Sequence, residues 1–174
     1  MNSFSELQRF RIRWAWAAVI VFNLVFLYAI GQQIIFKIPF GSKPAPAYVL
    51  VLIELLPLSL LIFLFSIKLY THYSTEGITY RFTPFHLRSR KIEWHELASI
   101  SFRNYNALYE FGGWGIRSGN KQTGKAYISS SASTIGLQLQ FKNGNLLLIS
   151  TQYPTELKAR IDNWTTEGII NKSF

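Results

Sequence analysis

Two long apolar runs near the start of the sequence constrain this chain more than any other feature. The first extends from Trp14 to Ile30 with Asn23 as its only polar residue, and the second extends from Ala47 to Leu69. About 20 residues of α-helix cross the hydrocarbon core of a bilayer, because each residue rises about 1.5 Å. Both runs reach that length, and we predict membrane-spanning helices over residues 14–35 and 47–69.

The composition agrees with a membrane protein. Hydrophobic residues make up 49% of the 174 residues and charged residues only 16%, whereas soluble domains average roughly 25% charged residues. The chain contains no cysteine, which excludes disulfides, thiolate metal sites and cysteine nucleophiles. The net charge of +9 is compatible with nucleic acid, anionic lipid or topology signals, and the positions of the charges must decide among them.

The segment between the two runs, "KIPFGSKPAP", is rich in proline and glycine and predicts a tight connection. The two spans then form a hairpin. A cleaved signal peptide is the alternative for the first run, but its apolar core is long and a second span follows at once. Basic residues flank the outer ends of the hairpin more densely than its loop; they are Arg9, Arg11 and Arg13 before it, and Lys68, Arg81, Arg88, Arg90 and Lys91 after it. The positive-inside rule predicts a multi-pass protein of the cell inner membrane with both termini in the cytoplasm.

One acidic residue, Glu54, lies inside the second run. A carboxylate in lipid is costly, so such residues usually have a partner or a function. A proton or ion relay would need further ionisable groups at depth, and the first run supplies only Asn23. We therefore expect an intramembrane polar contact in which Glu54 is bonded to Gln32 or Gln33 across the hairpin.

After Tyr70 the sequence favours β-strands. Residues 77–82, "GITYRF", alternate and are rich in β-branched and aromatic residues, and residues 97–105, "LASISFRNY", alternate again. Residues 136–152, "GLQLQFKNGNLLLISTQ", predict a hairpin that turns at Asn143-Gly144. In the first strand of this hairpin one face should carry Leu137, Leu139 and Phe141, and the other should carry Gln138, Gln140 and Lys142.

The C-terminal segment "YPTELKARIDNWTTEGI" predicts one amphipathic helix, because Leu157, Ile161 and Trp164 recur at helical spacing. Thr155 is the expected N-cap. The chain thus divides into a basic cytoplasmic segment (residues 1–13), a transmembrane hairpin (14–69) and a cytoplasmic domain (70–174). We expect an α+β membrane protein whose domain has about seven strands.

Several segments together resemble a known family. Two spans that lead into "THYSTEGITYRFTPFHLRSRKIEWHEL", followed by "YEFGGWGIR", "GKAYISS" and "STQYPTELKARI", are similar to small two-span bacterial membrane proteins with a pleckstrin-homology-like (PH-like) cytoplasmic domain. The resemblance covers nearly the whole chain. It implies a strongly bent antiparallel sheet capped by one C-terminal helix. It implies no catalytic residue, cofactor or established ligand.

The stretch "GNKQTGKA", Gly119 to Ala126, is one residue short of the phosphate-binding P-loop, G-x-x-x-x-G-K-[ST]. Ala126 stands where a magnesium-binding hydroxyl is needed, and "AYISSS" follows instead of a helix. The only aspartate of the chain, Asp162, lies in the final helix. We predict a polar loop between strands and no nucleotide hydrolysis.

The three histidines predict no metal site, since His95 and Glu96 are adjacent and would face opposite ways on a regular strand. We expect His72, His86 and His95 to be surface or interfacial residues. No nucleophile–base–acid set stands out, and we predict a protein that is not an enzyme and has neither a catalytic site nor a cofactor.

The segment "YEFGGWGIR" admits two interpretations. Its glycines mark a bulge where a sheet bends, with Trp114 in the core. Alternatively, Trp114 and Arg117 form a ligand shelf or enter the membrane interface. The first interpretation suits a strongly curved sheet better.

Basic residues are the remaining signal for a binding surface. We predict contact with lipid or a partner for a set of residues in the cytoplasmic domain: Arg88, Arg90, Lys91, Trp114, Arg117, Lys121 and Lys125. Anionic headgroups attract nearby lysine and arginine, whereas neither a recognition helix nor a stacking motif for nucleic acid is evident. The alternative for these charges is that they only enforce topology and solubility.

Two functions follow from these features. The first is a non-enzymatic binding module at the cytoplasmic membrane surface, for a protein partner or anionic lipid headgroups. The second is a structural or assembly subunit whose hairpin packs against another membrane protein or a second copy of the chain.

Overall fold

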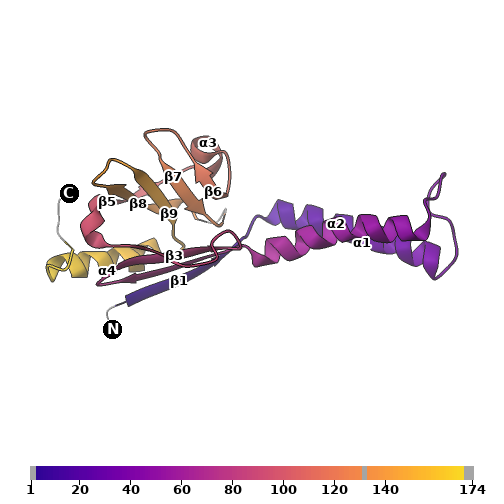
Figure 1. Ribbon diagram of the computed structural model, residues 1–174, viewed down its shortest axis with the longest axis horizontal. Helices are drawn as coiled ribbons and strands as arrows, with labels where there is room; N and C mark the ends of the chain where they lie inside the picture. Colours follow the sequence, from indigo (N-terminus) through magenta and orange to yellow (C-terminus); the bar gives the residue numbers. More distant parts are fainter. Residues whose placement is uncertain (1–2, 131–132, 171–174) are drawn as a thin grey trace. The chain divides into compact units, whose positions relative to one another are not determined.

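The computed structural model describes residues 3–130 and 133–170, and Figure 1 labels most of its helices and strands. Within that part of the chain the fold is mixed α+β, with two long apolar helices followed by two β-sheets. The chain divides into a helical unit, Ile12–Ser66, and a β-rich unit that combines the residues up to Arg11 with those from Ile67 onward. The N-terminal segment therefore belongs to the β-rich unit.

The helical unit contains α1 (Arg13–Ile34) and α2 (Ala47–Ser66). At 1.5 Å per residue these helices are about 33 and 30 Å long, and both are long and apolar enough to cross a membrane. The rings of Trp16 and Phe65 meet at 4.6 Å, so the start of α1 lies against the end of α2. The second helix ends earlier than predicted, because the chain from Lys68 continues as a strand.

The first sheet is antiparallel and has the strand order β1 (Ser3–Arg9), β2 (Lys68–Ser74), β3 (Gly77–Thr83), β4 (Arg90–Ile92). Strands β1 and β2 pair along their whole length, with Arg9 opposite Lys68. Residues 1–13 were expected to be a flank apart from the domain, and this expectation is wrong for the strand residues. The helical hairpin is thus inserted between two neighbouring strands of one sheet.

The second sheet has the order β5 (Leu97–Asn104), β8 (Ile135–Phe141), β9 (Leu146–Ser150), β7 (Lys125–Ile128), β6 (Gly115–Ser118). Its strands pair antiparallel except β7 and β9, which are parallel. The described residues therefore contain nine strands in two sheets, and the prediction of about seven strands in one antiparallel sheet is wrong. Four of the strands have only three to five residues, too few to show an alternating pattern.

The longer predicted strands are confirmed. Strand β3 covers "GITYRF", and β8 and β9 form the predicted hairpin, in which Gly144 has a φ of +84°. In β5 the register shifts between Leu97 and Ser99, so Leu97 and Ile100 are both buried. The strictly alternating faces predicted there are wrong, because a bulge adds one residue to the strand.

The predicted C-terminal helix is α4 (Pro154–Thr166), which buries Leu157, Ile161 and Trp164 as expected. Its N-cap is Tyr153, not Thr155, because Pro154 occupies the first helical position and no side chain caps the helix. Trp164 packs against Trp94 at a centroid distance of 6.2 Å. Trp94 lies in the 3₁₀ turn Trp94–Glu96, between the two sheets in the sequence.

The core of the β-rich unit lies where the two sheets face each other. Tyr80 of β3 and Tyr127 of β7 meet there at a centroid distance of 5.0 Å. The largest fully buried apolar side chains come from both sheets and from α4: Leu69, Tyr73, Ile78 and Phe82 from the first sheet, Ile128, Leu137, Leu139, Leu148 and Ile149 from the second, and Leu157 from α4. Burial of each such side chain contributes about 1.5–3 kcal/mol.

Strand β1 adds a polar link to this core through Gln8, which is fully buried. Its Oε1 accepts hydrogen bonds from the hydroxyls of Ser129 (2.7 Å) and Ser150 (2.8 Å), and its Nε2 donates to the carbonyl oxygen of Ser150. These bonds join the first sheet to strand β9 and to the residue after β7.

Glu6, also on β1 and also buried, makes a second polar link. Its Oε2 accepts from the hydroxyl of Thr151 at 2.8 Å and its Oε1 accepts from the backbone N–H of Gln152 at 2.6 Å. Burial raises the pKa of this carboxyl group, and the two hydrogen bonds act in the opposite direction.

Candidate functional site

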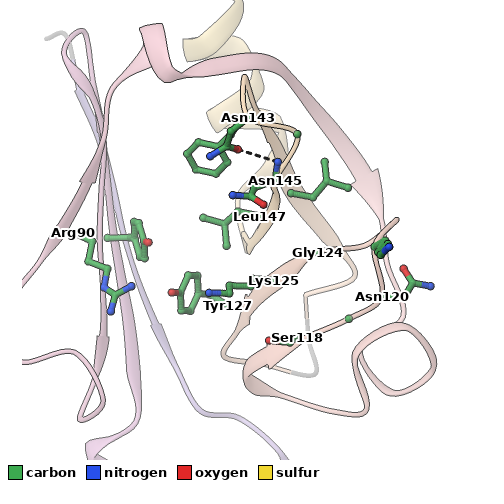
Figure 2. Close-up of a pocket in the computed structure, with 15 residues that line it drawn as sticks. Arg90, Ser118, Asn120, Gly124, Lys125, Tyr127, Asn143, Asn145 and Leu147 are labelled. Carbon is green, nitrogen blue, oxygen red and sulfur yellow. Dashed lines mark hydrogen bonds between the residues drawn. The ribbon is translucent and has the colours of Figure 1, made fainter.

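A cleft of about 730 Å³ opens in the β-rich unit between the first sheet and two hairpins of the second. Tyr80 and Arg90 line it from strands β3 and β4, Lys121 and Lys125 line it from the β6–β7 hairpin, and residues 143–145 line it from the β8–β9 turn. Figure 2 shows Arg90 on one side, with Lys125 and the asparagines of the turn on the other. The volume is that of a small-molecule site.

The lining of the cleft is positively charged. Arg90, Lys121 and Lys125 contribute three cations, and none of its lining residues is aspartate or glutamate. The side-chain amides of Asn120 and Asn143 add further polar groups. A cleft lined by one sign of charge raises the local concentration of the opposite sign, so this lining favours an anionic group.

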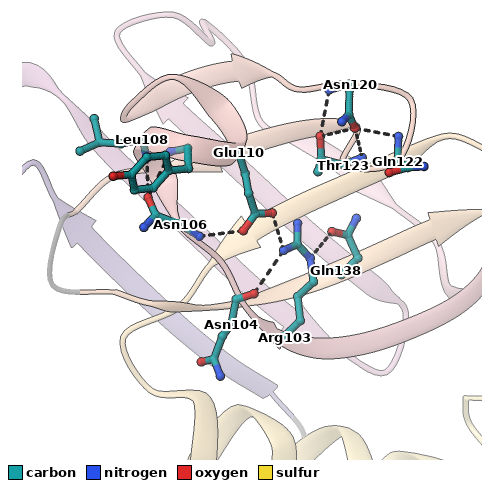
Figure 3. Close-up of polar contacts among 10 residues, drawn as sticks. Arg103, Asn104, Asn106, Leu108, Glu110, Asn120, Gln122, Thr123 and Gln138 are labelled. Carbon is teal, nitrogen blue, oxygen red and sulfur yellow. Dashed lines mark hydrogen bonds and ion pairs between the residues drawn. The ribbon is translucent and has the colours of Figure 1, made fainter.

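The stretch that resembles a P-loop forms one wall of this cleft as the β6–β7 hairpin loop, which confirms the predicted inter-strand loop. The side-chain oxygen of Asn120 accepts hydrogen bonds from the backbone N–H groups of Gln122 and Thr123, both at 2.9 Å (Figure 3). The N–H of Gly119 donates to the carbonyl oxygen of Gly124 at 2.7 Å and closes the loop. Strand β7 follows, so no helix N-terminus is present to bind phosphate as in a P-loop.

Gly124 is required at its position in this loop. Its φ is +72°, and a Cβ atom would lie 2.2 Å from the carbonyl oxygen of Leu146 on β9. The loop can therefore approach the β8–β9 hairpin closely only because this residue has no side chain. Gly124 and Leu146 both line the cleft.

Aromatic rings form the inner wall of the cleft. Tyr80 packs on Tyr127, and His86 lies 5.9 Å and 5.3 Å from these two rings. Burial, followed by the neighbouring Tyr127, raises the pKa of Tyr80 well above its ordinary value, while Arg90 acts in the opposite direction. The Tyr80 hydroxyl therefore keeps its proton at neutral pH and remains a hydrogen-bond donor.

His86 is buried, so the expectation that it is a surface or interfacial residue is wrong. Its Nδ1 accepts a hydrogen bond from the backbone N–H of Phe82 at 3.2 Å, and the backbone N–H of His86 donates to the carbonyl oxygen of Phe82 at 2.8 Å. Burial and then the charge of Arg90 lower the pKa of His86, which favours the neutral ring. His72 is only half-buried, and His95 is exposed as predicted.

The structure brings three of the predicted contact residues to the cleft and leaves the others outside its lining. Lys91 points away from the adjacent Arg90 and pairs with Glu76 at 3.0 Å. The Nε of Arg117 donates to the carbonyl oxygen of Trp114 at 2.8 Å. Arg88 lies in the loop between β3 and β4 and is exposed.

The glycine-rich aromatic segment does not form the predicted bulge within a strand. Its first part is the short helix α3 (Ala107–Phe111), which ends at Gly112 in the left-handed conformation at a φ of +70°. Trp114 is partly buried and packs on a cluster that includes Phe111, so the expected core role is only partly right. Tyr109 is 91% exposed. The glycines reverse the chain after a helix, which explains them without a ligand shelf.

A network of hydrogen bonds caps helix α3 and was not predicted from the sequence. Asn106 accepts two backbone N–H bonds from the first turn of α3, and Glu110 Oε1 accepts the backbone N–H of Asn106 at 2.8 Å (Figure 3). Arg103 joins this network through Nη1 to Glu110 Oε2 at 2.6 Å and through Nε to Gln138 Oε1 at 2.9 Å. The signal that could have shown it is the asparagine followed four residues later by glutamate, a variant of the capping box.

In the helical unit, Glu54 does not make the predicted contact. Its side chain is 6% exposed, and neither carboxylate oxygen has a hydrogen-bond partner among the described residues. Gln33 instead donates to the carbonyl oxygen of Ala45, and Asn23 donates to a carbonyl oxygen one turn earlier in α1. The prediction that Gln32 or Gln33 binds Glu54 is therefore wrong.

Within residues 3–130 and 133–170, no three His, Asp or Glu side chains come close enough to hold a metal ion. No family model matches the chain, and no curated protein sequence matches it. The resemblance to two-span proteins with a PH-like domain thus stays a prediction.

Proposed function

We propose that this chain is a non-enzymatic, membrane-anchored binding module. Helices α1 and α2 cross the inner membrane as a hairpin, and the β-rich unit is a PH-like domain that binds an anionic group of a ligand at the cytoplasmic surface. The observation that carries the proposal is the cleft, whose lining holds Arg90, Lys121 and Lys125 and no acidic residue.

The exposed surface of the helices supports the membrane anchor. Phe22, Leu24 and Leu56 are 61%, 60% and 76% exposed, and most other apolar side chains of both helices are exposed as well. Monomeric soluble proteins rarely expose contiguous apolar surface of this extent. A bilayer would cover these side chains, and both helices have the length that it requires.

The pairing of β1 with β2 supports the proposal that both ends of the chain lie on the same side of the membrane. These strands precede and follow the hairpin directly, and they are hydrogen-bonded from Ser3 to Arg9. Two strands of one ladder must lie on the same side of a bilayer, which a hairpin of two spans achieves. The basic residues that flank the hairpin lie on the same side as these two strands. We therefore place the β-rich unit in the cytoplasm.

The chemistry of the cleft suits phosphate or carboxylate oxygens. Arg90 offers a planar fork that can bind two oxygens, and Lys121 and Lys125 act as point charges. The Tyr80 hydroxyl and the asparagine amides can donate to the same oxygens. An anionic lipid headgroup and an acidic or phosphorylated site on a partner protein both present such groups.

Pyrophosphate is a suitable soluble probe for this cleft. The full chain is reconstituted in nanodiscs of neutral phosphatidylcholine and titrated with pyrophosphate by calorimetry. Arg90→Ala and Lys125→Ala should each weaken binding about tenfold to a hundredfold, since a charge-assisted hydrogen bond contributes about 1.5–3 kcal/mol. Lys142→Ala is the matched control, because Lys142 is exposed beside the cleft but does not line it.

The outcomes separate the sources of the anion. Wild-type protein that does not bind pyrophosphate, or equal affinities in the cleft variants and the control, would contradict an anion site. If the wild-type protein binds pyrophosphate more weakly in discs that contain anionic phosphatidylglycerol than in neutral discs, a headgroup of the same membrane reaches the cleft. If binding does not weaken, the anion comes from a soluble ligand or a partner protein.

Glu54 favours a second function, assembly of a membrane complex through the hairpin. Its carboxylate is buried in the helical unit with no bonded partner among the described residues. A buried polar group without a partner is costly in lipid, and a donor from another membrane protein or a second copy would remove that cost.

Co-purification in mild detergent tests this assembly role. Partners or dimers that are retained by wild type and lost in Glu54→Leu, but kept in Glu54→Gln, would support it, since glutamine preserves the size and the acceptor oxygen. The same partners on wild type and both variants would contradict it.

A further inference from the structure

The loop between β3 and β4, residues 84–89, presents apolar side chains to solvent. Leu87 is 87% exposed and Phe85 is 55% exposed, and Arg88 beside them is exposed as well. Leu87 is among the most exposed large apolar residues of the β-rich unit. Exposed apolar groups next to basic ones are typical of surfaces that contact a bilayer.

His86, the buried residue in the middle of this loop, holds the loop in this shape. The backbone N–H of His86 and its Nδ1 both bond to the backbone of Phe82, and the Nε of Arg81 donates to the carbonyl oxygen of His86 at 3.2 Å. With His86 fixed inward, Phe85 and Leu87 on either side of it are left exposed. The apolar groups are therefore displayed by an anchored turn.

The strand register places this loop close to the end of α2. Strand β2 begins at Lys68, two residues after Ser66 ends α2, and Lys68 is the pairing partner of Thr83, the last residue of β3. The hydroxyl of Thr83 also donates to the carbonyl oxygen of Lys68 at 3.3 Å. Two residues of chain reach about 7 Å and paired Cα atoms lie about 5 Å apart. Thr83, the residue just before the loop, thus lies within about 12 Å of Ser66, whatever the angle between the two units.

We propose that residues 84–89 are a membrane-contact loop: Phe85 and Leu87 enter the headgroup region of the cytoplasmic leaflet, and Arg88 binds lipid phosphate. The inference rests on the proposed function, because it requires α2 to end at that leaflet. Further cations lie at the same end of the first sheet, where Arg9 is paired with Lys68 and Arg81 follows on β3. They add attraction to an anionic surface.

The chain has no cysteine, so one introduced cysteine can carry one fluorophore. The full chain is labelled with nitrobenzoxadiazole at Leu87→Cys and reconstituted in vesicles of phosphatidylcholine and phosphatidylglycerol that contain nitroxide lipids. Glu76→Cys is the matched control, since Glu76 lies in the turn at the other end of β3, about 20 Å away along the strand. Leu24→Cys in the middle of α1 reports whether the hairpin is in the bilayer.

We expect headgroup-level nitroxide to quench the Leu87 probe severalfold more than the Glu76 probe, and deep nitroxide to quench the Leu24 probe. Arg88→Glu should reduce the quenching of the Leu87 probe, and Arg117→Glu, an exposed arginine outside the loop, should not. Equal quenching at Leu87 and Glu76 with a quenched Leu24 probe would overturn the contact loop alone. An unquenched Leu24 probe would overturn the membrane anchor itself.

Discussion

Replacement of Gln8 by leucine tests whether the N-terminal strand is an integral part of the β-rich unit. The Gln8 side chain is fully buried and makes three hydrogen bonds, with the hydroxyls of Ser129 and Ser150 and with the Ser150 carbonyl oxygen. Leucine preserves most of the volume and the burial but removes all three bonds. The substitution therefore isolates the polar link between the two sheets.

The expected cost follows from the groups that lose their partner. A buried polar group without a partner costs about 1–3 kcal/mol. The two serine hydroxyls can rotate toward other acceptors, which lowers their share, so we expect a loss of about 3 kcal/mol in the free energy of unfolding. For a unit of this size that loss corresponds to a fall in Tm of about 10 °C.

The measurement is thermal unfolding of the full chain in detergent, followed by near-UV circular dichroism from the aromatic core. Gln122→Leu is the control, because Gln122 is exposed in the β6–β7 loop and should change stability by no more than about 0.5 kcal/mol. Ser129→Ala added to Gln8→Leu should recover part of the loss, since it removes one of the groups left unpaired. A fall in Tm of less than about 3 °C for Gln8→Leu would refute the argument.

Three further perturbations test other parts of the β-rich unit by the same thermal assay. Burial raises the pKa of Glu6 from 4.5, so the stability contributed by the protonated acid should be lost as the pH rises through the folded-state pKa, and Glu6→Gln should abolish that loss. The pKa of His86 is lowered from 6.5, so stability should fall as the pH drops below about 6.5, and His86→Gln should remove this dependence. Gly124→Ala should cost about 2–4 kcal/mol, because its Cβ would meet a carbonyl oxygen at 2.2 Å, whereas Gly144→Ala, with similar φ but open space, should cost about 1 kcal/mol. Equal losses at the two glycines would contradict the close approach at Gly124.

Elements with a long local pattern could be predicted from the sequence. The two apolar helices, strand β3, the β8–β9 hairpin and helix α4 each carry many residues with one period, and neighbours in the chain reinforce the pattern. The exact boundaries could not be predicted, because a boundary depends on which competing element pairs with the next residue. The second helix, for example, ends at Ser66 because β2 needs Lys68 for its ladder.

Strand β1 could not be predicted because its pattern is inverted. Glu6 and Gln8 face the core and Leu7 is 52% exposed, so the hydrophobicity of the segment points to the wrong face. Its strand partner, β2, also lies on the far side of both helices in the sequence. Only the three-dimensional structure shows that these polar side chains form hydrogen bonds with a buried serine and with a backbone N–H group.

The cleft could not be predicted either, because its residues are far apart in the sequence. Its lining comes from six strands and two turns, so no local motif contains it. Arg90, Lys121 and Lys125 were all predicted as contact residues, but only the fold shows that these three line one cleft, with Arg90 on β4 at the edge of the first sheet. The near match to a P-loop was misleading as a nucleotide motif, although the loop does carry two of the three cations that we assign to anion binding.

The insertion of the hairpin between β1 and β2 has a consequence for folding. β1 is the first strand of the chain, yet its strand partner ends at residue 74 and the partners of Gln8 lie at residues 129 and 150. The pairing of β1 with β2 and the hydrogen bonds of Gln8 each close a long loop of chain. The hydrogen bonds of Gln8 can form only after the second sheet has formed, so we infer that β1 joins the fold late. Because β1 and β2 both continue into the hairpin, this late step also fixes the two ends of the hairpin beside each other. A change at Glu6 or Gln8 should then loosen the attachment of the hairpin before it disturbs the distant edge strands β5 and β6.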